Sequence, residues 1–257
     1  MEEYQSKKLL YHLSMSERTI KLLKRVGFDR NIKRGWLDKT ADLLILGADE
    51  KSIRNILEDD IIKEIPSKVN RRKSISILIQ SWVNVREEHK DIHDKALKLY
   101  EKSDNNEKLA LHWCMMTLAY ELFFDISEII GKLLSFQNEF SLGMVRRKVF
   151  DIWGERSTLY YATERVLRSM RDLAVLEQNE NPGQYRRADK IEIKDREIQL
   201  LLVEVYLIAS KRINIPYTEL QMINALFPFK IDATLNDVQS YKNFKINTMG
   251  MELVISL

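Results

Sequence analysis

A strongly apolar stretch near the middle of the chain constrains the fold more than any other feature. Residues 109–124 read LALHWCMMTLAYELFF. A helix that spans a membrane needs about 20 predominantly apolar residues. Here His112 and Glu121 interrupt the run, and Asp125 and Glu128 follow closely. We therefore expect a helix that is buried in a protein core, and no membrane-spanning segment.

The overall composition favours a folded and mainly helical protein. The chain has 257 residues, of which 45% are hydrophobic, enough for one large domain or for two or three small ones. Only 8 Gly and 4 Pro occur, which disfavours a loop-rich or all-β fold. Charged residues make up 31% of the chain and aromatic residues are scattered along it, so long disordered stretches are not expected.

The cysteine content and the start of the chain indicate a cytoplasmic protein. Cys114 is the single cysteine, so it cannot form a disulfide within the chain, which fits a reducing compartment. The first residues, Met1-Glu2-Glu3-Tyr4, are acidic and no apolar segment follows them. This start does not have the pattern of a signal peptide.

Apolar periodicity and turn residues divide the chain into three regions. Helices are expected at residues 36–46, 52–57, 67–85 and 91–101. The clearest break in composition is Ser103-Asp104-Asn105-Asn106, after which one or two long helices cover residues 107–136. We expect an N-terminal helical region at 1–104, a central helical and winged helix-turn-helix module at 105–195, and a C-terminal winged-helix-like module at 196–257.

The central region has the element order of a winged helix-turn-helix. In chain order the sequence predicts a helix at 141–153, a turn at 154–156, a second helix at 158–172, a strand at 173–177, a turn at 179–183 and a second strand at 190–194. The tail repeats this order faintly. A helix covers 196–211, short helices follow Pro216, and a hairpin turns near Gly250.

The second of these central helices carries a candidate DNA-binding face. Its outer side presents Tyr161, Arg165 and Arg168, with Arg171 beside them. Arginine matches phosphates and the guanine edge, and the second helix of such a motif enters the major groove. The preceding helix adds Arg146, Arg147 and Lys148, and the hairpin adds Arg186 and Arg187. The alternative is a solvated helix face in a domain that contacts other proteins.

A second basic site begins the helix at residues 67–85. Residues 65–86 contain five Lys or Arg and no Asp or Glu, and Arg71, Arg72 and Lys73 fall in the first turns of the helix. The helix dipole disfavours cations there, and a bound phosphate would reverse this penalty. The alternative is an exposed helix start whose cations are balanced by the acidic neighbours Asp59, Asp60 and Glu64.

No pattern indicates catalysis or a metal site. His89 and His93 are four residues apart, but Lys90 stands where a zinc protease helix needs Glu, and no third ligand is evident. We expect these histidines to lie on a solvated helix face. Glycine-rich phosphate loops, nucleophile elbows and CxxC pairs are absent. The sequence therefore predicts a binding protein that is not an enzyme and needs no cofactor.

Several local patterns across residues 36–257 resemble the BrxA family of BREX bacteriophage-exclusion systems. They are WLDKTADLLILG at 36–47, IRNILEDDI at 53–61, the Arg71-Arg72 helix start, the run at 109–176, and LFPF at 226–229. The resemblance implies a mainly α fold, with a NusB-like helical core and winged helix-turn-helix modules carrying short β-hairpins. It also implies binding of double-stranded DNA and work alongside other BREX proteins.

These observations predict a double-stranded DNA-binding accessory protein of a phage-defence system. The alternatives are a scaffold of the defence complex with weak DNA contact, or an RNA-binding NusB-like protein. DNA binding predicts a continuous positive strip that joins Arg165 and Arg168 to the Arg71 region, whereas a scaffold predicts an exposed apolar patch. The tail has six Lys or Arg, six Asp or Glu and an apolar end, so we expect it to mediate protein contacts, self-association included.

Overall fold

The apolar run folds as two helices, where the sequence predicts one or two across residues 107–136. In the computed structural model, which describes residues 25–257, α6 (Asn105–Ala119) and α7 (Glu121–Leu134) are separated by Tyr120 in an extended conformation. Eleven residues of α6 are buried. Within residues 25–257, no single helix is long and apolar enough to cross a membrane; α6 and α7 reach that length only as a pair bent by 118°.

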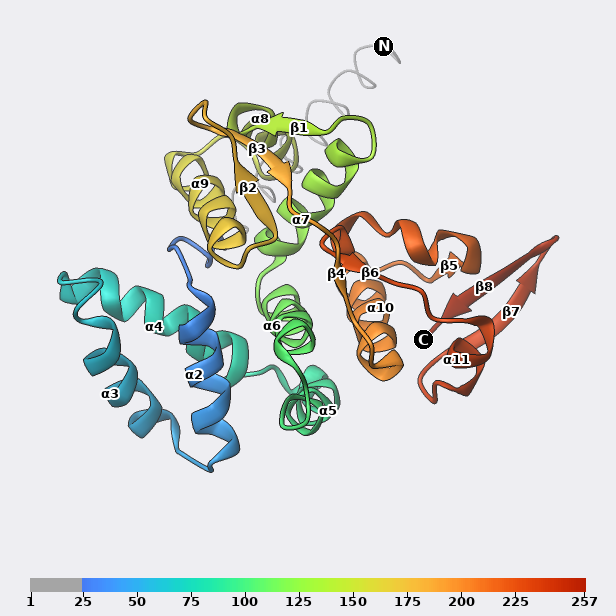
Figure 1. The fold of residues 1–257 in the computed structure, drawn as a ribbon, viewed down its shortest axis with the longest axis horizontal. Coiled ribbons are helices and arrows are strands. Elements are labelled where there is room, and N and C mark those ends of the chain that lie inside the picture. The colour runs from blue at the N-terminus through green and yellow to red at the C-terminus, as the bar shows by residue number, and fades with distance from the viewer. Residues whose placement is uncertain (1–24) are drawn as a thin grey trace, which may run out of the picture.

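The N-terminal part is a group of helices that packs on one side of α6 (Figure 1). It contains α2 (Arg34–Ile45), α3 (Glu50–Ile61), α4 (Lys68–Trp82), the 3-10 helix η1 (Glu87–His89) and α5 (Lys90–Tyr100). Side-chain caps start α3, where Asp49 accepts from the backbone N–H of Ser52, and α6, where Asp104 with Glu107 forms a capping box. The prediction of a mainly helical chain is confirmed.

The central α/β unit packs against α7. It consists of β1 (Glu139–Ser141), α8 (Leu142–Trp153), α9 (Ser157–Asp172), β2 (Leu176–Gln178) and β3 (Gln184–Arg187), with antiparallel strands in the order β1-β3-β2. Both helices lie where the sequence predicts them. The first hairpin strand begins only at Leu176, because α9 ends at Asp172 with Leu173 as its C-cap, and Ala174 then takes a positive φ of 59°.

The predicted second hairpin strand at residues 190–194 is wrong. The hairpin returns earlier, at β3, whereas β4 (Ile191–Glu192) pairs in parallel with β6 (Phe229–Lys230) of the tail. Alternating apolar residues mark a strand but not its partner. Here the partner lies nearly forty residues further along the chain.

The tail forms a second α/β unit of similar order. It contains α10 (Arg196–Ser210), β5 (Asn214–Pro216), the 3-10 helices η2 (Tyr217–Met222) and η3 (Asn224–Leu226), α11 (Leu235–Ser240), β7 (Lys245–Met249) and β8 (Glu252–Ser256). The strands lie in the order β5-β8-β7, and the hairpin turns at Gly250 as predicted. In both units the first strand therefore pairs with the last.

One hydrophobic core runs through all three regions, from Phe28 to Ile255. The predicted boundaries at residues 104 and 195 coincide with the N-caps of α6 and α10. However, α6 contacts helices on both sides of it, α2, α4 and α5 on one and α10 on the other. The three regions therefore share one hydrophobic core.

We predict that Gly131→Ala destabilises the protein. Gly131 lies in α7 where η3 crosses it, and an added Cβ would lie 1.9 Å from the carbonyl oxygen of Asn224. Overpacking of this kind lowers the free energy of unfolding by about 1–3 kcal/mol, which urea denaturation measures. Gly35→Ala in α2 is the matched control, because its Cβ meets nothing within 4 Å. Equal stability of Gly131→Ala and wild type would contradict the close approach.

Candidate nucleic-acid interface

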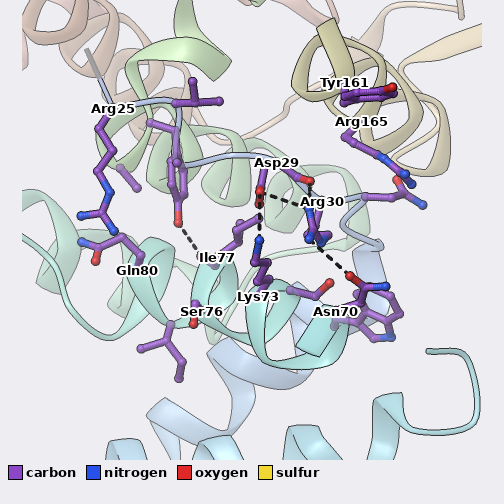
Figure 2. A pocket seen from close by; sticks show the side chains of 18 of the residues that line it. Arg25, Asp29, Arg30, Asn70, Lys73, Ser76, Ile77, Gln80, Tyr161 and Arg165 are labelled. Carbon is purple, nitrogen blue, oxygen red and sulfur yellow. Dashed lines mark hydrogen bonds and ion pairs between the residues drawn. The ribbon is translucent and has the colours of Figure 1, made fainter. Parts of the chain in front are cut away.

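A basic cleft of about 1660 Å³ lies between the N-terminal helices and the central unit (Figure 2). One wall consists of α4 and the segment before α2, and the other is the start of α9. Eight Arg and Lys side chains line it against three carboxylates. The cations are Arg25, Arg30, Lys33, Arg54, Lys73, Arg86, Arg156 and Arg165, and the carboxylates are Asp29, Glu64 and Glu121.

The helix α4 presents a single narrow polar stripe to the cleft. Asn70, Lys73, Ser76 and Gln80 line the cleft, and from residue 74 to its end the helix exposes only Ser76 and Gln80. The other residues of α4 from 74 to 82 are buried, which fixes the orientation of the helix. Figure 2 shows Tyr161 and Arg165 of α9 across the cleft from this stripe.

Exposed ion pairs balance part of the positive charge. Asp29 lies 3.1 Å from Arg30 and 3.8 Å from Lys73, while Lys33 pairs with Glu64. Such exposed pairs contribute little in water, so a phosphate group can replace the carboxylate at small cost. Within residues 25–257, the side chain of Arg165 has no hydrogen-bond or ion-pair partner. The cleft is therefore a region of positive potential suited to an anionic ligand.

The structure brings together parts of the two basic sites that the sequence predicted separately. Tyr161 and Arg165 from α9 and Lys73 from α4 line the same cleft. Arg168, which the sequence places on the same face, is exposed on α9 but does not line the cleft. Arg72 is exposed at the start of α4, also outside the cleft lining.

Arg71 is buried, which does not fit the DNA contact predicted for it. Its side chain is 5% exposed, and it donates through Nε and Nη2 to Glu58 at 3.0 and 2.8 Å. Its Nη1 donates to the carbonyl oxygens of Ile65 and Pro66. Glu58 and two carbonyl oxygens therefore balance this cation at the helix start, and Arg71 holds the turn between α3 and α4.

Arg146 is a second predicted contact that has a structural role. Its Nη2 donates to Glu164 at 3.0 Å and its Nε to the carbonyl oxygen of Tyr160 at 3.1 Å. Its guanidinium also lies 3.6 Å from the centre of the Tyr160 ring. Arg146 therefore fastens α8 to α9 and is not available for DNA.

The other predicted cations are exposed and lie away from the cleft. Three of them are paired: Arg168 with Glu164, Arg171 with Asp172, and Arg186 with Glu177. Arg147, Lys148 and Arg187 are exposed on α8 and β3. None of these six residues lines the cleft with Arg165.

Sequence reasoning missed most of the cleft cations. Arg25, Arg30, Arg54, Arg86 and Arg156 come from loops and from α3, far apart along the chain. No local spacing relates them, since helix and strand periodicities apply only within one element. The only available signal was the absence of acidic residues from 65–86.

The histidines predicted to lie on a solvated face are packed into the protein. His89 is largely buried, and this burial lowers its pKa. The His93 ring nitrogen Nε2 lies 2.8 Å from the carbonyl oxygen of Trp82. Among the residues that the structure describes, no group of three His, Cys, Asp or Glu is placed to hold a metal ion.

The fold and the site together describe a mainly helical protein with two small α/β units and a basic cleft. Comparison with family models, curated proteins and solved structures finds no match for this chain.

We predict that substitution of two neighbouring arginines affects stability to different extents. Arg71→Ala removes hydrogen bonds to Glu58 and to two carbonyl groups, so it should lower the free energy of unfolding by about 1.5–3 kcal/mol. Arg72→Ala is the matched control at an exposed position, and it should change stability by less than about 0.5 kcal/mol. Urea denaturation measures both. If Arg71→Ala were as stable as Arg72→Ala, the buried role of Arg71 would be wrong.

Proposed function

We propose that this chain binds double-stranded DNA in the basic cleft, as an accessory protein of a BREX-type phage-defence system and not as an enzyme. The observation that carries the proposal is the convergence of eight cations, from α4 and the loops on one side and from α9 on the other, on one cleft. Cations placed on phosphates supply most of the non-specific affinity for DNA. The BREX assignment rests on the sequence resemblance described above.

Double-stranded DNA fits the cleft better than a single strand does. Proteins that bind single strands stack successive bases on exposed aromatic rings. The cleft contains three aromatic residues, but Trp36 and Tyr120 are each only 8% exposed. Tyr161 alone offers an open ring, so contacts to the backbone dominate.

The proposed fold of the DNA-binding part is a winged helix-turn-helix. Supporting it are the two adjacent helices α8 and α9, the hairpin that follows them, and the strand order β1-β3-β2. The tail supports a second module of this kind through its order β5-β8-β7. For the helical part, α2 to α7, we propose the NusB-like core that the resemblance implies.

A second candidate function, a protein scaffold, is favoured by the tail. Met249 is 58% exposed and Met251 is fully exposed at the tip of the β7–β8 hairpin, and Met222 is 69% exposed. Figure 1 shows this hairpin projecting from the rest of the molecule. Exposed apolar side chains at a sheet edge suit a protein partner. We propose that contacts with other BREX proteins, or self-association, use this part.

The DNA proposal predicts a weaker and less salt-dependent complex for Lys73→Ala combined with Arg165→Ala. Each lost phosphate contact should reduce the slope of log affinity against log salt by roughly 0.9. Fluorescence anisotropy with a labelled 30-base-pair duplex measures both quantities. The control is Lys242→Ala with Lys245→Ala, two exposed cations in the tail, which should keep affinity within about twofold.

Single-stranded DNA and duplex RNA of the same sequence complete the test. Duplex DNA should bind most tightly. A folded Lys73 and Arg165 double variant with unchanged duplex affinity would show that the cleft is not the DNA site. Tighter binding of RNA than of DNA would favour the RNA-binding alternative.

A further inference from the structure

We propose that α4, and not α9, reads base edges in the DNA that the cleft holds. This inference rests on the proposed function and adds to it which residues of the cleft contact phosphates and which contact bases. The cations of the cleft, Lys73 of the stripe included, would hold phosphates, while Asn70, Ser76 and Gln80 of α4 would contact the bases. Two sets of observations support it, one on each helix.

Two arginines of α9, Arg168 and Arg171, form ion pairs with acidic residues of the same helix. Glu164 binds Arg168 through one carboxylate oxygen and Arg146 through the other. Arg171 donates to Asp172 and to Gln178. Arg165 remains, on the wall opposite α4, as a single cation suited to a phosphate. The helix that the sequence predicts as the reader therefore brings to the cleft one arginine, Arg165, and neither Arg168 nor Arg171.

The stripe on α4 has the residue types that recognise bases. Asn70, Ser76 and Gln80 line the cleft and are exposed, and residues 65–86 contain no acidic side chain that would repel DNA. Asparagine and glutamine form paired hydrogen bonds with adenine, and serine bonds to several bases. Cations bind phosphates more strongly than amides do, so phosphate binding alone does not explain the amide side chains in this stripe.

Hydrogen bonds within the protein orient both amides. Arg30 donates through Nη2 to Oδ1 of Asn70 at 3.3 Å, which leaves the NH2 group of Asn70 as a donor (Figure 2). The Nε2 of Gln80 donates to the carbonyl oxygen of Asn84 at 2.8 Å, which leaves Oε1 as an acceptor. Asn70 is therefore suited to a base with an acceptor such as N7, and Gln80 to an exocyclic amino group.

The spacing of the two amides defines a footprint. Ten residues of α-helix span about 15 Å, which corresponds to roughly four base-pair steps along DNA. The helix holds this spacing because its other face is buried, with Leu78 and Trp82 inaccessible to solvent. We therefore expect two preferred base positions roughly four base pairs apart.

Selection from a pool of duplexes with a randomised 20-base-pair centre tests the inference. Wild-type protein should enrich a preference at two such positions. Asn70→Ala should lose one preference and Gln80→Ala the other, each by about fivefold or more, which is the low end for one base contact. Affinity for the unselected pool and its salt slope should stay within about twofold, because no phosphate contact is lost.

Controls separate the possible failures. Gln239→Ala removes an exposed glutamine of α11, outside the cleft, and should leave the preference intact. Thermal denaturation confirms that each variant is folded. Loss of the preference in Arg168→Ala but not in the α4 variants would make α9 the reader and overturn the inference. Binding without any enriched sequence would also overturn it while the proposed function stands, whereas no duplex binding at all would overturn the proposed function itself.

Discussion

The burial of α6 is the constraint on which the rest of the structure depends. His112 and Trp113 are consecutive residues that bind opposite parts of the protein. His112 accepts a hydrogen bond from Trp82 at Nδ1 and donates through Nε2 to Asp38, while Trp113 donates to the carbonyl oxygen of Ala225. Burial lowers the pKa of His112 and so favours the neutral ring that this arrangement requires. Because a helix buried on every side must be covered by several elements, α6 joins the N-terminal helices to the tail.

The cleft follows from this arrangement. Its walls are parts of one hydrophobic core, since α4 packs on α6, and α9 packs on α7. Close to the cleft, the chain before α2 is also bonded directly to α9, where Ile32 donates to Ser169 and Asn31 to Asp172. A cleft whose walls are fixed in this way needs little reorganisation when it binds a ligand, which favours affinity.

Charge distribution says more about this protein than total charge. The chain has a net charge of only +3, yet eight cations and three carboxylates meet in one cleft. Other arginines serve the fold, as the contacts of Arg71 with Glu58 and of Arg146 with Glu164 illustrate. In the tail, Lys and Arg equal Asp and Glu in number, and exposed methionines mark the hairpin. The two ends of the molecule are thus suited to different partners.

Sequence alone determined the features that depend on near neighbours: the helical class, the positions of α8 and α9, and the hairpin turn at Gly250. Periodicity and turn residues act over a few positions, so they can be read along the chain. Only the tertiary structure decided the partner of the strand at Ile191–Glu192. It decided that Arg71 is buried while Arg72 is exposed. It also decided that Arg165 shares a cleft with α4. Such contacts join residues far apart in sequence, and helical and strand periods do not determine which distant elements pack together.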